Sequence, residues 1–176
     1  MSRFGFLRNI FVSFPAVFSL ILLPFVVFTQ NETACLVING KYELTDTPID
    51  IAIVSVYSND RIIQIYETKK NGEFVLTLPF QQDFQIRIDK PGLLSLFINL
   101  STYMPQSKAI KTIMFTFENI KAIVSSEIQD INKIELIPYT YIAYDVSKGN
   151  FTENSEQIEL FKQSIINATI DNSSEN

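Results

Sequence analysis

The sequence predicts an all-β sandwich, because four stretches of alternating polar and apolar residues follow one another between residues 49 and 98. In residues 84–89 every second side chain is apolar, and this period of two is typical of a strand with one buried and one solvated face. Turn signals divide the stretches, at Asn71-Gly72 and at Lys90-Pro91-Gly92. The chain has 176 residues, of which 47% are hydrophobic, so it can bury one core.

The same alternation and the turns between the stretches predict the individual strands in order. We expect them at residues 35–44, 49–57, 61–68, 73–78, 84–89, 93–100, 112–118, 133–137 and 139–144. The segment 120–131 fits a strand, a short helix or both, and the polar segment 101–111 is expected to be a loop. Gly40 permits a bulge or a close backbone approach within the first strand. The stretch 49–57 is apolar on both faces, which predicts a central strand.

The period changes near the C-terminus from that of a strand to that of a helix. Ile158, Phe161 and Ile165 lie at i, i+3 and i+7, and Asn154 with Gln157 forms an N-cap and N3 pair. We therefore expect a helix over residues 153–166 that packs on a sandwich domain of residues 30–152. Residues 167–176 are rich in Asn and Ser without periodicity, which predicts a disordered tail.

Residues 1–29 predict export. They contain Arg3 and Arg8, no acidic residue, and an almost unbroken apolar run over residues 10–28, which we expect to form a hydrophobic helix. The length of this run lies between that of a secretory signal and the roughly 20 residues of a membrane span. Cleavage after residue 29 and retention as an N-terminal anchor both stay open, and membrane contact is expected only through residues 10–28 if they are retained. The expected location is the periplasm, the cell envelope or the outside of the cell.

The composition excludes several kinds of chemistry. The chain has no histidine, which removes zinc sites with histidine ligands and catalysis by Ser-His or Cys-His pairs. Its single cysteine, Cys35, cannot form an internal disulfide and lies too far from the apolar run to be read as a lipid attachment site. The net charge of -5, with scattered basic residues, disfavours nucleic acid. We expect no cofactor and no metal.

Acidic residues offer the remaining catalytic chemistry. Asp46 with Asp50, and Asp83 with Asp89, are the candidate acid and base pairs, but these residues flank turns, where Asp is favoured by local hydrogen bonds. The loop that begins at Asp145 has a weak likeness to a calcium loop, although Lys148 places a positive charge inside it. We expect an ordinary hairpin there and no catalytic residue.

Four aromatic residues form the candidate partner surface, for an envelope protein or a glycan: Tyr139, Tyr141, Tyr144 and Phe151. In one strand Tyr139 and Tyr141 share a face and Tyr144 lies on the opposite face. At least one of these sets is therefore expected in the core.

Residues 36–100 resemble the carboxypeptidase regulatory-like domain. The resemblance rests on Thr47-Pro48 followed by alternating apolar residues, on Thr68 with Gly72 and Phe74, and on Lys90-Pro91-Gly92, where Leu93 replaces the usual aromatic. It implies a transthyretin-like, Ig-like Greek-key β-sandwich and assigns no activity. Residues 137–151 are similar to the tail that follows this domain in exported proteins of Gram-negative envelopes, and they carry structure only.

The function expected from the sequence is that of a non-catalytic exported module that binds a partner or builds structure in the cell envelope. One alternative is a carboxylate-dependent glycan hydrolase, which needs two carboxyls about 5 to 10 Å apart in a cleft. The other is an envelope assembly subunit that adds a strand at an exposed sheet edge.

Overall fold

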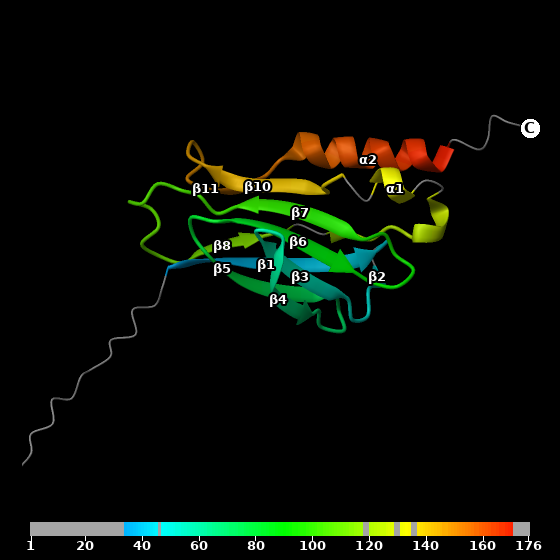
Figure 1. The fold of residues 1–176 in the computed structure, drawn as a ribbon, viewed down its shortest axis with the longest axis horizontal. Helices are drawn as coiled ribbons and strands as arrows, with labels where there is room; N and C mark the ends of the chain where they lie inside the picture. Colours follow the sequence, from blue (N-terminus) through cyan, green and yellow to red (C-terminus); the bar gives the residue numbers. More distant parts are fainter. Residues whose placement is uncertain (1–33, 46, 118–119, 129–130, 135–136, 171–176) are drawn as a thin grey trace, which may run out of the picture. The chain divides into compact units, whose positions relative to one another are not determined.

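The computed structural model describes residues 34–45, 47–117, 120–128, 131–134 and 137–170. Within these ranges the chain forms two β-sheets, one of five strands and one of six, followed by a C-terminal helix (Figure 1). Apolar side chains from both sheets and from the helix form one buried core. The predicted all-β class with a C-terminal helix is therefore confirmed. The hydrophobic helix predicted within residues 1–29 lies outside the described residues.

The five-stranded sheet is organised around β1 (Cys35–Leu44), which matches its predicted bounds. β1 pairs antiparallel with β5 along one side and parallel with β8 and β9 along the other, and β2 pairs with its C-terminal end. The bounds of these partners are Thr47–Pro48 for β2, Glu73–Pro79 for β5, Ile113–Thr116 for β8 and Ile120–Lys121 for β9. Leu36 and Ile38 of β1 are fully buried, so one face of this sheet contributes to the core.

The six-stranded sheet has the order β11-β10-β7-β6-β3-β4. All neighbours are antiparallel except β7 and β10, which run parallel. The bounds are Ile53–Ser58 for β3, Arg61–Glu67 for β4, Asp83–Asp89 for β6, Leu96–Ser101 for β7, Thr140–Asp145 for β10 and Asn150–Glu153 for β11. β3 lies between β4 and β6, which confirms the central strand predicted for this part of the chain.

Two glycines allow close approaches between strands. A Cβ at Gly40 would collide with the ring of Phe74, which lies across the β1-β5 pair, so this site needs the close approach that the sequence suggested. Gly72 has a φ of +79°, and a Cβ there would collide with the carbonyl oxygen of Tyr42. The Asn71-Gly72 turn is therefore fixed by its backbone conformation and by its contact with β1.

Helix α2 (Ser155–Ile170) begins where the capping residues predicted it. The side chain of Asn154 accepts a hydrogen bond from the backbone N–H of Gln157 at 3.1 Å, which is the N-cap contact. Phe161 of α2 is buried, and the helix contacts β10. α2 continues to Ile170, so residues 167–170 are helical and not part of the predicted disordered tail; residues 171–176 lie outside the described residues.

Several predicted elements differ from the structure. The strand predicted at 133–137 overlaps the end of the short helix α1 (Ile131–Ile134), where Ile134 is buried, so this short apolar run was read with the wrong period; residues 135–136 lie outside the described residues. Residues 49–52 precede β3 without joining it. The hairpin expected after Asp145 is formed by β10 and β11, but no bounds were predicted for β11, because its four residues show too little alternation. The described helices include none with the length and apolarity of a membrane span.

Candidate functional site

The solvent-facing side of the six-stranded sheet carries the main candidate site. Strand pairing places Tyr57 of β3 opposite Gln85 of β6, Gln85 opposite Asn99 of β7, and Asn99 opposite Tyr141 of β10. Opposite residues in a sheet lie on the same face, so these four side chains form one line across four strands. We call this line the Tyr57–Tyr141 row. It spans three strand spacings, or roughly 14 Å.

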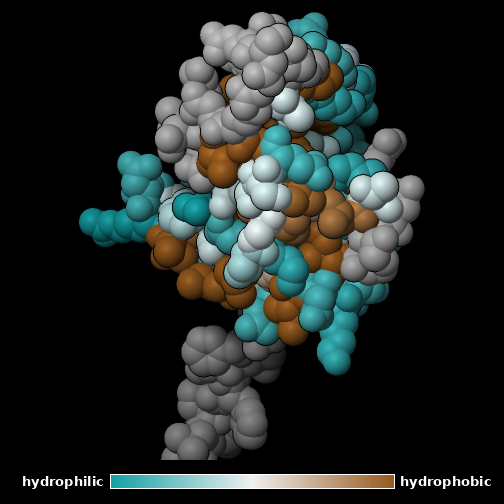
Figure 2. Space-filling model, turned by 90° about the vertical axis from the view of Figure 1, so that its right-hand side faces the viewer, coloured by the Kyte–Doolittle hydropathy of each residue, from teal (hydrophilic) through white to brown (hydrophobic). Residues whose placement is uncertain are grey.

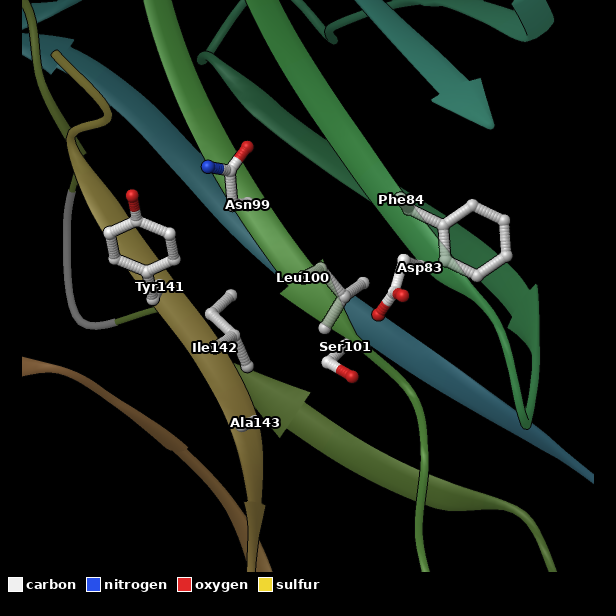
Figure 3. Close-up of a pocket in the computed structure, with 8 residues that line it drawn as sticks. All are labelled: Asp83, Phe84, Asn99, Leu100, Ser101, Tyr141, Ile142 and Ala143. Carbon is white, nitrogen blue, oxygen red and sulfur yellow. The ribbon is translucent and has the colours of Figure 1, made fainter. Parts of the chain in front are cut away.

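The two side-chain amides in the middle of the row, those of Gln85 and Asn99, are hydrogen-bonded to each other. The side-chain amide of Gln85 donates a hydrogen bond to Asn99 Oδ1 at 3.3 Å, which leaves the amide of Asn99 as a donor and the oxygen of Gln85 as an acceptor. Tyr141 is 43% exposed, and Figure 3 shows its ring beside Asn99 on the neighbouring strand. The row therefore presents an exposed aromatic ring next to amide groups that both donate and accept.

A depression of about 340 Å³ adjoins the Tyr141 end of the row. Its polar side chains come from Asp83 and Ser101, which are paired across β6 and β7, and from Asn99 and Tyr141 (Figure 3). Apolar atoms form most of the rest of its surface, from residues such as Phe84 and Leu100. A ligand in this depression would contact an aromatic ring and a few fixed polar groups, which is the usual composition of a small-molecule site.

Two charged groups beside the row, Arg87 and Asp89, form an ion pair with one another. Arg87 Nε donates to Asp89 Oδ1 at 2.8 Å, and the hydroxyl of Ser95 donates to the same oxygen at 2.5 Å. The guanidinium carbon of Arg87 lies 5.2 Å from the centre of the Phe97 ring, within range of a cation–π contact. This side of the row is thus held by a local network with balanced charge.

The structure separates the four aromatic residues of the predicted partner surface. Tyr139 is half-buried with its ring edge-on to Phe161 of α2 at 5.5 Å between centroids, and burial raises its pKa. Tyr144 packs edge-on against Phe151 at 5.4 Å, and Phe151 is only 3% exposed and stacks on Phe80. Tyr141 alone among the four is exposed. Sequence reasoning missed Tyr57, Gln85 and Asn99, because only strand order reveals that they are neighbours of Tyr141.

The candidate carboxylate pairs do not come together among the described residues. Asp83 and Asp89 occupy opposite ends of β6, roughly 20 Å apart at the rise of a strand. Asp46, the proposed partner of Asp50, lies outside the described residues. In the described ranges no three His, Cys, Asp or Glu side chains lie close enough together to hold a metal ion.

Two acidic side chains have clear structural partners. The side chain of Glu43 is 3% exposed and forms two ion pairs, one between its Oε1 and Lys121 Nζ at 2.7 Å and one between its Oε2 and Lys41 Nζ at 2.8 Å. Hydrogen bonds from these two lysines lower the pKa of Glu43. Asp145 caps the β10-β11 turn, because its Oδ1 accepts from the hydroxyl of Ser147 at 2.5 Å and from the backbone of Lys148 at 3.2 Å. The hydrogen bond from Ser147 is the main cause of the lowered pKa of Asp145. The loop thus has the geometry of a hairpin turn.

Comparisons with known proteins assign no family. No family model and no curated protein matches the chain. Among solved structures, the crystal structure of S.CueP is similar over 47% of this chain and 59% of that chain, with 15% sequence identity and a TM-score of 0.32. The match therefore spans less than two thirds of that structure, and a score at this level carries no argument about function.

Proposed function

We propose that this protein is a non-catalytic exported binding module that holds a neutral polymer, such as a glycan strand of the cell envelope, across its six-stranded sheet. The observation that carries the proposal is the Tyr57–Tyr141 row. Tyrosine rings offer flat apolar surfaces for the C–H faces of sugars, and amides donate and accept hydrogen bonds to hydroxyl groups. A straight row of about 14 Å suits an extended chain better than a compact ligand.

The charge distribution favours a neutral ligand. The row itself contains no ionisable group other than the tyrosine hydroxyls, and the nearby Arg87 is held by Asp89. An anionic polymer would be expected to need several basic side chains along its path. A hydroxyl-rich neutral chain matches the aromatic and amide groups that are present.

Export of the chain and its assignment to the carboxypeptidase regulatory-like sandwich are part of the same proposal. The basic and apolar segment of residues 1–29 supports export, either as a cleaved signal peptide or as an anchor. The sequence motifs around Gly72 and Gly92 support a transthyretin-like, carboxypeptidase regulatory-like sandwich. Within this proposal the fold acts as a rigid support for the row, and the chain needs no cofactor.

A carboxylate-dependent glycan hydrolase is the alternative that uses the same surface. Asp83 is the one acidic side chain among the residues that line the depression. Glycoside hydrolysis commonly needs a pair of carboxyls about 5 to 10 Å apart. A binding module fits the lining better, because binding needs no second carboxyl.

Binding of the full-length protein to insoluble polysaccharides tests the proposal. Purified peptidoglycan, chitin and cellulose serve as probes, and binding is measured by co-sedimentation. We expect retention on at least one of them and about fivefold weaker retention for Tyr141→Ala, since an aromatic contact contributes about 1 kcal/mol. Tyr103→Ala is the control, because Tyr103 is also an exposed tyrosine, at 54% against 43% for Tyr141, but lies in a loop after β7. No retention on any probe, or equal losses in the two variants, would overturn the proposal.

A further inference from the structure

The loop between β7 and β8, residues 102–112, lies beside the point where the chain enters the sandwich. Ala34 borders a depression of about 510 Å³ together with Ala109 of this loop. The Sγ of Cys35, the first residue of β1, lies 3.7 Å from the Oγ1 of Thr112. Figure 1 shows the start of β1, this loop and the β10–β11 turn at one end of the two sheets, which we call the entry end.

The backbone of the loop is held by contacts with the rest of the domain and within itself. Gln81 Nε2 donates a hydrogen bond to the carbonyl oxygen of Met104 at 2.6 Å, and the side chain of Met104 is buried. The backbone N–H of Lys108 donates to the carbonyl oxygen of Pro105 at 2.8 Å, which closes a tight turn. The loop therefore presents its exposed side chains from a fixed backbone.

The entry end carries the two most exposed large apolar side chains of the described residues. These are Ile110 in the loop, which is 79% exposed, and Val146 in the β10–β11 turn, which is 75% exposed. β7 and β10 run parallel, so the loop and the turn leave the sheet at the same end. Figure 2 faces the opposite end, where brown apolar residues lie between teal hydrophilic ones, and there Ile51 and Ile53 are only 41% and 37% exposed.

Positive charge accompanies the exposed apolar side chain of the loop. Lys108 and Lys111 are both exposed, and neither forms an ion pair with another residue that the structure describes. Loop 102–112 contains no acidic residue. Asp60 and Asp83 lie at the same end, but on the six-stranded sheet, in the β3–β4 turn and at the start of β6. The positive charge is therefore concentrated in the loop beside the chain entry.

The apolar run of residues 10–28 joins the domain at this end. Six residues, 29–34, separate the run from Cys35. Six fully extended residues reach at most roughly 20 Å. When the run spans a bilayer, as in the anchored form of the proposed export, this short connection keeps the entry end within that distance of the lipid surface.

We propose that loop 102–112 is a second membrane contact of this chain, made with the surface of an anionic phospholipid bilayer. Ile110 enters the interfacial region, where exposed apolar side chains are removed from water. Lys108 and Lys111 lie beside lipid phosphates, whose negative charge attracts lysines close to the surface. This contact adds to the one expected through residues 10–28, so it rests on the anchored form of the proposed function.

Tryptophan fluorescence tests the contact in the full-length protein inserted into vesicles of phosphatidylglycerol and brominated phosphatidylcholine, whose bromine atoms quench tryptophan. The chain has no tryptophan, so each variant reports from one site. Ile110→Trp is expected to lose most of the emission that it shows in the same vesicles without bromine. Ile51→Trp is the matched control, because Ile51 is an exposed isoleucine at the opposite end, and it is expected to keep its emission. Circular dichroism reports folding, and Ser107→Trp replaces Ile110→Trp if that variant does not fold.

Charge reversal in the Ile110→Trp chain tests the role of the lysines. Lys108→Glu with Lys111→Glu is expected to lower the quenching, because glutamates are repelled by the anionic surface. Lys69→Glu with Lys70→Glu is the matched control, since these exposed lysines precede β5 at the opposite end. This control makes the same change in net charge and is expected to leave the quenching unchanged.

Three results would rule out the membrane contact. One is equal quenching of the tryptophans at positions 110 and 51. Another is an Ile110→Trp emission that moves to shorter wavelength without quenching, which would indicate a protein partner in place of lipid. The third is an equal loss of quenching in the two lysine variants. Tyr141→Ala is expected to leave the quenching unchanged and Ile110→Trp to leave polysaccharide retention unchanged, so failure of lipid contact and failure of polymer binding are distinguishable.

Discussion

The two edges of the six-stranded sheet are built differently. At one edge β11 is four residues long, and its Phe151 is buried against Phe80 and Tyr144. β11 also contacts β8 of the other sheet, and the chain passes directly from β11 into α2. At the other edge β4 is seven residues long and exposes three isoleucines. The β11 edge is therefore short and anchored by a buried aromatic residue, whereas the β4 edge is longer and exposes apolar side chains.

The contrast shows that the two edges of one sheet can differ in how accessible they are to another strand. A short strand anchored by a buried aromatic residue and followed by a helix gives little room for an incoming strand. A longer strand with exposed apolar side chains leaves more of its backbone accessible to one. We therefore expect the β11 edge to contribute more to the stability of the fold than the β4 edge.

The largest expected effect separates stability at the two edges. Phe151→Ala should lower the free energy of unfolding by about 3–5 kcal/mol, because Phe151 is buried and its removal leaves a cavity beside the partly buried rings of Phe80 and Tyr144. Ile65→Ala should cost less than about 1 kcal/mol, since Ile65 is 61% exposed. Urea denaturation measures both values. Similar losses in the two variants would remove the distinction between the edges.

An intermediate effect is expected where the β11 edge passes into α2. Asn154→Ala removes the side-chain acceptor for the backbone N–H of Gln157 and should cost about 1 kcal/mol. Gln163→Ala, at an exposed position of the same helix, is the control and should be close to neutral. Thermal unfolding of the two variants checks the difference. A control as unstable as the cap variant would mean that α2 contributes through its whole length.

The smallest effect concerns the turn that closes the β11 edge, and it depends on pH. The pKa of Asp145 is lower in the folded protein than its ordinary value of 3.8, chiefly because of the hydrogen bond from Ser147. A lowered pKa contributes stability above the unfolded pKa, and this contribution is lost as the pH falls through the folded pKa.

Asp145→Asn should therefore be less stable than the unmodified chain at pH 7, and the difference should shrink toward zero in acid. Urea midpoints at neutral and acid pH measure it. A difference between the two proteins that stays constant with pH would show that the charge of Asp145 has no part in closing the turn.

Much of the fold could be predicted from local patterns. The bounds of β1, the turn at Gly72 and the cap of α2 by Asn154 were all predicted, because alternation, positive φ and capping depend on a few neighbouring residues. The last two residues of the helix α1 were predicted as the start of a strand, because a short apolar run has no clear period. Phe151 was a candidate for the partner surface, but in the structure it is buried and stacks on Phe80. That position could not be predicted, because Phe80 is far from Phe151 in the sequence.

The sequence by itself determined that the chain is a β-rich protein with one apolar core, a C-terminal helix and no histidine chemistry. Tertiary structure alone decided that Gln85 and Asn99 lie between Tyr57 and Tyr141, and that β4 and β11 form the two edges of the six-stranded sheet. The physical reason is that the period of a strand is fixed by its own backbone, whereas strand order is fixed by pairing between segments that are distant in the chain.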